Sequence, residues 1–408
     1  MQKSETTDEK LAKLKAIIPS ADTEVLLDLL VSCGGNFNEA AALLRTDRNA
    51  SDEQDTRPVK KVRLQKQQSL SRYFGLKETS FLPAVGRRPV VLHGKHDIEG
   101  ALRYCTYHTN VLPAALADRL LARVMNDERA KPNEFYLFGN RCVTNCRTLL
   151  YGNLDAADAG RIFYNGHASK PASYDADLCE AQRLVEELVN AELAKRAKLP
   201  FQVPAGNWRC PVAVANIYER DSDLQWHSDR LTYIGPHAIV ASLTLGFERD
   251  FRLRRVYPAD SQIYSIPLAH NSVLIMHAGC QEEFKHCIPP ISKRSKVSTT
   301  DLHPVSGSVR VSLTFRHYKV DLARDAMCTE CGYPMDLRRT YKTPSKRGRY
   351  IWICSRSYSS GTDERVGNAC KGIKYARVDA IPPVTDIESE GNFWLADDDF
   401  EALNFRKS

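Results

Sequence analysis

The distribution of apolar positions predicts a central region in which helices are followed by strands. Apolar side chains recur at helical spacing over 112–125 and 176–195. Downstream, short apolar or alternating runs separated by turns predict strands at 212–218, 238–245, 251–256, 272–276 and 310–315. Short strands that follow helices favour an antiparallel sandwich or barrel flanked by helices, and the double-stranded β-helix (jelly roll) is one such architecture. We therefore expect an α+β, multidomain protein with a jelly-roll core over about 96–320.

The segment 9–46 is expected to form a small three-helix bundle. An apolar stripe over 11–18 ends at Pro19, and two further apolar groups follow at 25–30 and 41–44. The apolar pair before Pro19 and the closing Leu43–Leu44 resemble the ubiquitin-binding CUE/UBA family. That resemblance implies ubiquitin as a partner, and a capping bundle without a partner is the alternative.

The segment 47–95 is polar and basic, which is typical of a flexible linker that also serves nuclear import. Within it, Gln67, Leu70, Tyr73 and Phe74 resemble the PIP box that binds the sliding clamp, proliferating cell nuclear antigen. One helical turn would put the leucine and both aromatic rings on one face, while the glutamine makes a separate polar contact. In the alternative interpretation, the two aromatic rings pack the linker onto the next domain.

Composition limits the classes of function. The chain of 408 residues carries a net charge of +7, which is compatible with a nucleic-acid partner without requiring one. The N-terminal sequence MQKSETTDEK has no apolar core of a signal peptide, and no run approaches 18 apolar residues, so we expect neither secretion nor a membrane span. In a reducing compartment, the twelve cysteines are expected to be thiols or metal ligands.

Two potential metal ligands stand close together in the stretch LQWHSDR. His227 and Asp229 follow the predicted strand 212–218, so their side chains can converge. A further histidine would complete a two-histidine, one-carboxylate set, which is typical of non-haem Fe(II) oxygenases. His286, in FKHCIPP, is the preferred third ligand. Its competitors are His237, His270, His277 and His303.

A second group of residues predicts a site for an anion. Arg310 and Arg316 are six residues apart on a predicted strand and therefore share one face. Two guanidinium groups inside a barrel are costly unless each meets an anion, and 2-oxoglutarate has two carboxylates. Asn216 and Tyr218 share a face of their own strand and would hydrogen-bond the same molecule.

The order and spacing of these motifs, N-x-Y, H-x-D, H and R-x5-R, resemble the AlkB family of Fe(II)/2-oxoglutarate dioxygenases over roughly 96–320. The resemblance implies His227, Asp229 and His286 as iron ligands, with O2 as co-substrate. It also implies Asn216, Tyr218, Arg310 and Arg316 as the residues around 2-oxoglutarate. The implied reaction is oxidative demethylation of bases such as 1-methyladenine and 3-methylcytosine, with release of formaldehyde.

The substrate-facing residues are expected from the same resemblance. In YLFGN, Phe138 resembles the wedge that AlkB homologues acting on duplexes push into the base stack, although a core phenylalanine beside a turn is an equal alternative. Tyr151 matches a position that lines the base pocket of the family. Arg230 and Leu231 depart from the acidic residues that the family tends to carry after the metal aspartate, and Ser312 departs from its commoner asparagine. The first departure puts the preferred lesion in doubt.

Four late cysteines, Cys328, Cys331, Cys354 and Cys370, are the usual ligand set of a structural zinc site. The stretch RGRYIWIC and Tyr375 resemble the GRF zinc finger, over about 326–379, which implies Zn(II) and single-stranded DNA as a partner. Basic residues interleaved with Tyr341, Tyr350 and Trp352 would bind a backbone and stack on bases. A solvated basic face is the alternative, and the acidic tail at 380–408 is expected to dock on the protein or to bind a partner.

Three hypotheses of function follow. The first is a nuclear DNA demethylase coupled to replication or ubiquitin signalling. The second is an RNA or protein demethylase with the same chemistry. The third is a non-catalytic adaptor that bridges DNA, ubiquitin and the sliding clamp. The intact metal and arginine sets favour an enzyme, because a decayed site would be expected to lose at least one of these residues.

Overall fold

The structure is a computed structural model that describes residues 7–17, 26, 37–38, 41, 88–137, 140–154, 162–164, 167–168, 170–291, 302–323, 326–358, 370, 372–379, 384–386 and 391–407. The chain divides into two compact units, one with residues 1–87 and 259–261 and the other with 88–258 and 262–408. In the first unit, helix α1 (Thr7–Ile17) buries Leu11 and Leu14, in agreement with the first predicted apolar stripe. Most of the predicted bundle and the whole motif at 67–74 lie outside the described residues.

The second unit holds a two-sheet core and the cysteine-rich module. Its helices are α5 (Gly94–Ala101), α6 (Ala114–Met125), α8 (Ala176–Leu193), α9 (Leu231–Ile234), α10 (Cys280–Glu283) and α11 (Phe400–Lys407), with 3-10 helices η3 (Val320–Ala323) and η4 (Ser355–Tyr358). Among these described helices, none combines the length and apolar character that crossing a bilayer requires.

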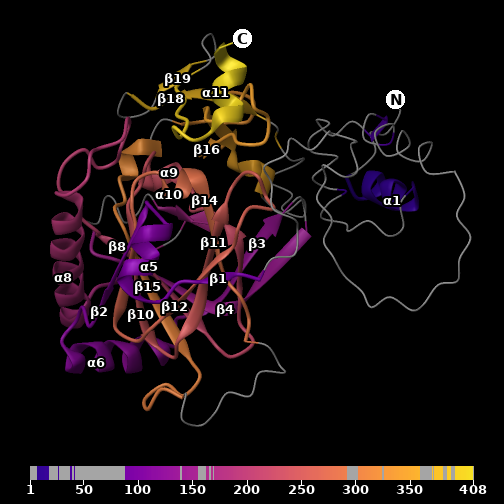
Figure 1. The fold of residues 1–408 in the computed structure, drawn as a ribbon. Coiled ribbons are helices and arrows are strands. Elements are labelled where there is room, and N and C mark those ends of the chain that lie inside the picture. Colours follow the sequence, from indigo (N-terminus) through magenta and orange to yellow (C-terminus); the bar gives the residue numbers. More distant parts are fainter. Residues whose placement is uncertain are drawn as a thin grey trace, which may run out of the picture. The chain divides into compact units, whose positions relative to one another are not determined.

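Two sheets form the core (Figure 1). The larger follows the order β2 (Cys105–Thr109), β13 (Ser272–Met276), β10 (Val240–Gly246), β15 (Arg310–Arg316), β8 (Val212–Tyr218), β4 (Asn140–Gly152) and β3 (Lys131–Leu137), with β7 (Ala172–Ser173) beside β4. The smaller follows the order β1 (Val90–Val91), β12 (Tyr264–Leu268), β11 (Arg249–Arg255), β14 (Phe284–Ile288) and β9 (Leu224–His227). A separate pair joins β5 (Phe163–Tyr164) to β6 (His167–Ala168).

The two faces of the larger sheet have different chemistry. On β15, Val311, Leu313 and Phe315 are buried in one cluster with residues of α6 and α8, which cover this face. The alternate residues of the same strand are polar and line a cavity on the other face: Arg310, Ser312, Thr314 and Arg316. Because side chains alternate along a strand, one sequence run supplies both the apolar core and the cavity wall. This confirms that the two arginines share a face.

The helix α8 shows how local sequence sets an element boundary. Asp175 precedes the helix in an extended conformation, and its carboxylate accepts a hydrogen bond from the backbone N–H of Leu178 at 2.9 Å. This N-cap satisfies a donor that the first helical turn leaves without an intrahelical partner. The predicted helices at 112–125 and 176–195 agree with α6 and α8 within two residues.

The strands agree equally well with the apolar pattern. The runs predicted at 212–218 and 272–276 coincide with β8 and β13, and those at 238–245, 251–256 and 310–315 differ from β10, β11 and β15 by at most two residues at either end. The segments around the metal motif differ more. His227 is the last residue of β9, a strand not predicted, and α10 separates His286 from the apolar strand β13.

The cysteine-rich module is a sheet of its own, in the order β16 (Met335–Arg339), β17 (Tyr350–Cys354), β18 (Ile373–Arg377) and β19 (Val384–Asp386). The acidic tail docks on this module. Backbone hydrogen bonds join Tyr350 to Asn392 and Trp394 to Gly348. Arg347 makes ion pairs with Asp399 at 2.8 Å and with Glu401 at 2.9 Å. Of the two predicted roles of the tail, the structure shows docking on the protein.

Candidate active site

Three potential metal ligands converge where β9 meets β14. The pairing of these antiparallel strands puts His227 opposite His286, and the two rings lie 4.2 Å apart between centroids. Asp229 follows two residues after His227, and its backbone N–H donates to the Gln281 side chain at 2.8 Å. One oxygen of Asp229, Oδ1, lies 3.8 Å from Nε2 of His227 and 3.9 Å from Nε2 of His286. The sequence-predicted triad is therefore brought together.

The protonation states of the triad suit metal binding. Nδ1 of His227 lies 2.7 Å from the carbonyl oxygen of Gln225, so Nδ1 carries the proton and Nε2 keeps its lone pair. Burial, and then the neighbouring His227, lowers the pKa of His286 to about 3, so that its ring is neutral. Burial alone would raise the pKa of Asp229, but Arg316 and the two histidines outweigh it and keep that pKa well below its usual range.

Arg310 lies at the back of the cavity with unsatisfied donors. The cavity has a volume of about 910 Å³, and Asn216, Tyr218, Arg310 and Arg316 all line it together with the triad. Nη2 of Arg310 donates to Thr244 at 3.0 Å, whereas its Nε and Nη1 have no hydrogen-bond partner among the described residues. Burial lowers the pKa of this guanidinium to about 10. Such a buried cation would be stabilised by a carboxylate in the cavity.

A family model agrees with this geometry. The model of the 2OG-Fe(II) oxygenase superfamily matches residues 104–316, which is more than half of the chain. The chain belongs to this superfamily. Membership implies Fe(II), 2-oxoglutarate and O2. Two neutral imidazole nitrogens and one carboxylate fit Fe(II) and leave positions open on the metal, while the unsatisfied donors of Arg310 fit a carboxylate of 2-oxoglutarate.

Individual relatives of this oxygenase are AlkB homologues. It is 32% identical over 111 residues to "Alpha-ketoglutarate-dependent dioxygenase alkB homolog 3" of Homo sapiens, and 31% identical over 125 residues to "DNA oxidative demethylase ALKBH2" of Arabidopsis thaliana. Each match covers 25% of this chain and 35% of the relative, so the chain spans about a third of the length of these curated relatives. Among solved structures, OsALKBH1 aligns over 52% of this chain and 96% of its own, at 16% identity and a TM-score of 0.35.

The two arginines of the oxygenase have different partners. Arg310 is available to a co-substrate, whereas Nε of Arg316 donates to Oδ2 of Asp229 at 2.7 Å and so holds the metal carboxylate. Arg316 also lines the cavity, as does Asn216, whose side-chain oxygen accepts from the Thr148 hydroxyl at 2.9 Å. The sequence predicted that both arginines contact 2-oxoglutarate, because residues six apart on a strand share a face. Their different partners could not be predicted in this way, since those partners come from other segments.

Arg310→Gln is expected to raise the KM for 2-oxoglutarate roughly 10- to 100-fold, since a charge-assisted pair with a carboxylate contributes about 1.5–3 kcal/mol. Succinate formation against 2-oxoglutarate concentration measures this. Arg252→Gln is the matched control, because Arg252 lies on β11 and pairs with Asp250 away from the cavity. An unchanged KM in Arg310→Gln would remove Arg310 from the co-substrate site.

Several residues that support the site carry no sequence motif. Gln281 holds the backbone of Asp229, and Phe251 stacks on His286 with ring centroids 5.2 Å apart. The hydroxyl of Ser228 donates to the carbonyl oxygen of Phe284 at 2.8 Å, which joins the metal loop to β14. These contacts connect segments more than 30 residues apart, so no local pattern could reveal them.

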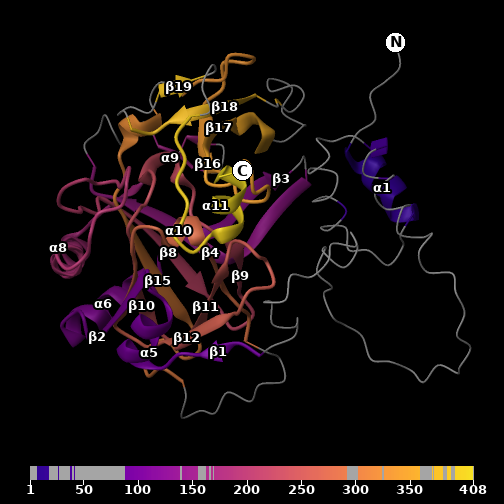
Figure 2. The ribbon, with the colours of Figure 1, turned by 45° about the horizontal axis from the view of Figure 1, so that its top comes forward.

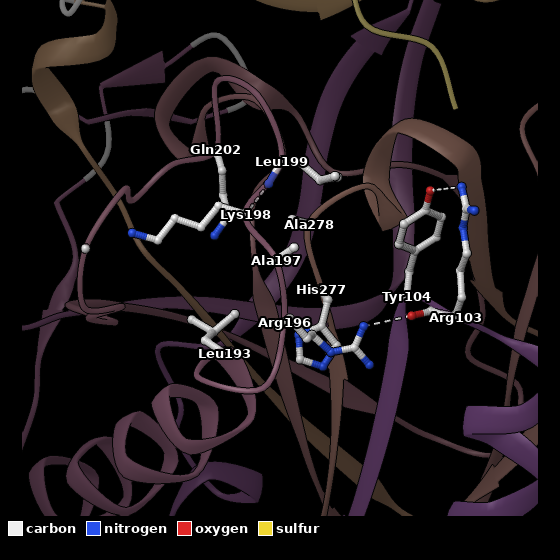
Figure 3. Close-up of a pocket in the computed structure, with 11 residues that line it drawn as sticks. Arg103, Tyr104, Leu193, Arg196, Ala197, Lys198, Leu199, Gln202, His277 and Ala278 are labelled. Atoms are coloured by element: carbon white, nitrogen blue, oxygen red, sulfur yellow. Dashed lines mark hydrogen bonds between the residues drawn. The ribbon is translucent and has the colours of Figure 1, made fainter. Parts of the chain in front are cut away.

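The competing histidines lie elsewhere. His237 is buried against Trp394, and His277 lies in a second pocket of about 260 Å³ beside Arg196 (Figure 3). His270 and His303 lie near Asp118, and the atoms with which these three residues could ligate a metal lie within 4.8 Å of one another. Nδ1 of His270 accepts from the backbone N–H of Gly246 at 3.0 Å, which leaves the proton of a neutral ring on Nε2. This second group is therefore a poor metal site.

Tyr151 requires a correction. Its side chain is only 1% exposed, packs in the core beneath α6 and α8, and donates a hydrogen bond to Asp127 at 2.8 Å. It does not line the cavity, because its position on β4 points toward the helices. We therefore withdraw its assignment to a base pocket. Phe138, the other predicted substrate residue, lies outside the described residues.

The four late cysteines form one cluster. Their sulfur atoms lie within 4.8 Å of one another, with Cys328 and Cys370 3.6 Å apart and Cys331 and Cys354 3.5 Å apart. A side chain at position 372 would disturb this cluster, because a Cβ on Gly372 would come within 2.5 Å of the Cys328 sulfur. Four thiols this close to one another could hold one metal ion, and four is the usual number of ligands in a structural zinc site.

The predicted stacking platform of the module requires a second correction. Tyr350 and Trp352 are fully buried in the core and cannot stack on bases. Arg347 and Arg349 are buried as well, and Arg347 is held by the acidic tail. Tyr341 and Tyr375 are partly exposed, and Lys342 and Lys346 are exposed. The surface of the module that could contact DNA is therefore smaller than the sequence predicted, and these two tyrosines and two lysines belong to it.

Proposed function

We propose that this oxygenase is an oxidative demethylase that reverses N-alkyl lesions of the 1-methyladenine and 3-methylcytosine type in DNA. The observation that carries the chemistry is the two-histidine, one-carboxylate set at the edge of a cavity whose inner wall holds Arg310. The substrate class is supported by the printed name of the Arabidopsis relative, a DNA oxidative demethylase.

The residues divide the work as follows. Bound iron supplies the oxidation of a methyl C–H bond by O2, coupled to conversion of 2-oxoglutarate to succinate and CO2. The hydroxymethyl product then loses formaldehyde and a proton, which restores the unmethylated ring nitrogen of the base. His227, His286 and Asp229 hold the metal, Arg310 and Tyr218 orient the co-substrate, and Arg316 keeps Asp229 ionised.

The remaining modules would direct the enzyme to its substrate. We assign Zn(II) to the cysteine cluster and contact with single-stranded DNA to the surface around Tyr341 and Tyr375. Ubiquitin binding by the N-terminal bundle, binding of the sliding clamp by 67–74 and a nuclear location rest on sequence motifs alone. Together they would couple the repair of bases to replication.

The direct test uses oligonucleotides that carry 1-methyladenine or 3-methylcytosine, incubated with Fe(II), ascorbate and 2-oxoglutarate. Mass spectrometry should show the loss of one methyl group per lesion, and His227→Ala should abolish it. Single-stranded and duplex DNA and the matching RNA are compared in parallel. Demethylation of RNA alone, or succinate formation without any loss of methyl, would overturn the assignment to DNA.

A further inference from the structure

The first strand of the cysteine-rich module forms part of the wall of the catalytic cavity. Asp336 and Arg338, both on β16, line the same cavity as the metal triad. In both views of the ribbon, β16 lies beside α9, the short helix that follows the metal loop (Figures 1 and 2). The module is therefore built into the active site.

Specific hydrogen bonds hold β16 on the catalytic core. The Thr232 hydroxyl donates to Oδ1 of Asp336 at 2.9 Å and accepts from the backbone N–H of Leu337 at 3.3 Å. Arg339, which is buried, donates to the carbonyl oxygen of Glu282 at 2.8 Å and to the Glu283 carboxylate at 3.3 Å. Thr232 lies on α9, while Glu282 and Glu283 lie on α10, so the strand is fixed to the elements that flank the triad.

A carboxylate between two arginines stands at this junction. Oδ2 of Asp336 lies 3.8 Å from Nη1 of Arg230 and 3.8 Å from Nη2 of Arg338. The Asp336 side chain is 13% exposed, whereas those of Arg230 and Arg338 are 36% and 27% exposed. The carboxylate of Asp336 is thus more buried than the two arginine side chains beside it. We call Arg230, Asp336 and Arg338 the rim cluster.

The rim cluster has the chemistry of a phosphate site. Guanidinium groups match the oxygens of a phosphate with two parallel hydrogen bonds, and both arginines of the cluster line the cavity that holds the metal triad. Arg230 directly follows the metal ligand Asp229, so a phosphate here would adjoin the nucleotide whose base occupies the cavity. Arg230 is also the residue that replaces an acidic group of the AlkB pattern.

We propose that Arg230 and Arg338 bind the backbone phosphate next to the target base, with Asp336 as the positioning residue that orients both. The inference deepens the proposed function and rests on it, since it takes the substrate to be a nucleic-acid strand. It assigns a substrate-binding residue, Arg338, to the zinc module. A substrate would then be recognised only when the catalytic core and the module are joined.

The test measures binding without turnover. Full-length protein loaded with Fe(II) and 2-oxoglutarate is kept anaerobic, and the fluorescence anisotropy of a single-stranded oligonucleotide with one 1-methyladenine reports its Kd. Arg338→Gln should weaken binding roughly tenfold and reduce the slope of log Kd against log salt by about 0.7. Arg183→Gln is the matched control, because Arg183 lies on α8, which covers the opposite face of the larger sheet, and pairs with Glu180 and Glu187 away from the cavity.

An uncharged methylphosphonate beside the methylated base locates the contact. It should weaken binding of the wild type more than Arg338→Gln does, because Arg230 loses its contact as well, and it should weaken Arg338→Gln less than it weakens the wild type. Arg338→Lys keeps the charge and is expected to keep the salt slope, which separates loss of contact from misfolding. Equal Kd values for Arg338→Gln and Arg183→Gln, or a loss on the methylphosphonate that is as large in Arg338→Gln as in the wild type, would overturn the rim cluster as a phosphate site.

These outcomes are distinguishable from failure of the proposed function. If the wild type removes no methyl group from DNA but loses affinity for the methylphosphonate oligonucleotide, the rim cluster stands and the demethylase assignment fails. If it removes methyl groups while Arg338→Gln behaves like Arg183→Gln in binding, the demethylase stands and the rim cluster fails.

Discussion

His286→Ala is expected to lower the formation of succinate from 2-oxoglutarate roughly 1000-fold or more, because the oxidation is supplied by a metal that this side chain holds. His286 is buried, stacks on Phe251 and lies opposite His227, so no neighbouring side chain can replace its nitrogen. Iron bound per chain, measured by mass spectrometry after anaerobic loading, should fall together with succinate formation.

His270→Ala is the matched control. His270 lies in the other histidine pair, next to His303 and Asp118, and outside the cavity. The His270→Ala variant is expected to bind iron and form succinate as the wild type does. Full succinate formation by His286→Ala, or a loss in His270→Ala as large as that in His286→Ala, would show that the metal is held elsewhere.

Cys354→Ser is expected to reduce both the stability of the cysteine-rich module and demethylation, the latter at least tenfold. A structural zinc site contributes roughly 10–16 kcal/mol of apparent binding energy, so the loss of one thiolate should unfold the module. Since β16 supplies Asp336 and Arg338 to the cavity wall, its unfolding opens the active site. Zinc content, limited proteolysis of the module and demethylation are measured together.

Cys179→Ser is the control for this substitution. Cys179 is an exposed free cysteine on α8, far along the chain from the cluster. Its variant should keep the zinc content and the activity of the wild type. Because the triad lies on β14, at the end of β9 and in the loop that follows β9, Cys354→Ser should still bind iron. Full demethylation by a protein that has lost its zinc would contradict a joint role of module and core.

The metal triad and the core strands could be read from the chain because they depend on local rules. Alternation of side chains along β15 puts three apolar residues on the face covered by helices and leaves Arg310 and Arg316 facing the cavity. The residue types of the triad are those that Fe(II) requires, and their order matches a known family. Neither the alternation of side chains along a strand nor the residue types of the triad depends on which distant segment packs against them.

The roles that failed or changed depend on partners far away in the sequence. Tyr151 was predicted to face a base, but Asp127 and the helices bury it. Arg347 belongs to the basic run that was predicted to contact DNA. Instead it forms ion pairs with two carboxylates of the acidic tail, more than 50 residues downstream. A basic or aromatic residue reads the same in sequence whether it is exposed or paired, since burial is a property of the packed chain.

The sequence by itself therefore determined most elements of the core, the candidate metal ligands and the kind of chemistry. Only the tertiary structure decided which arginine pairs with Asp229 and which keeps unsatisfied donors, which aromatic residues remain exposed, and that Asp336 and Arg338 of the module line the cavity. The physical reason is that periodicity sets which face a side chain occupies, whereas its partner is set by segments that meet only when the chain has folded.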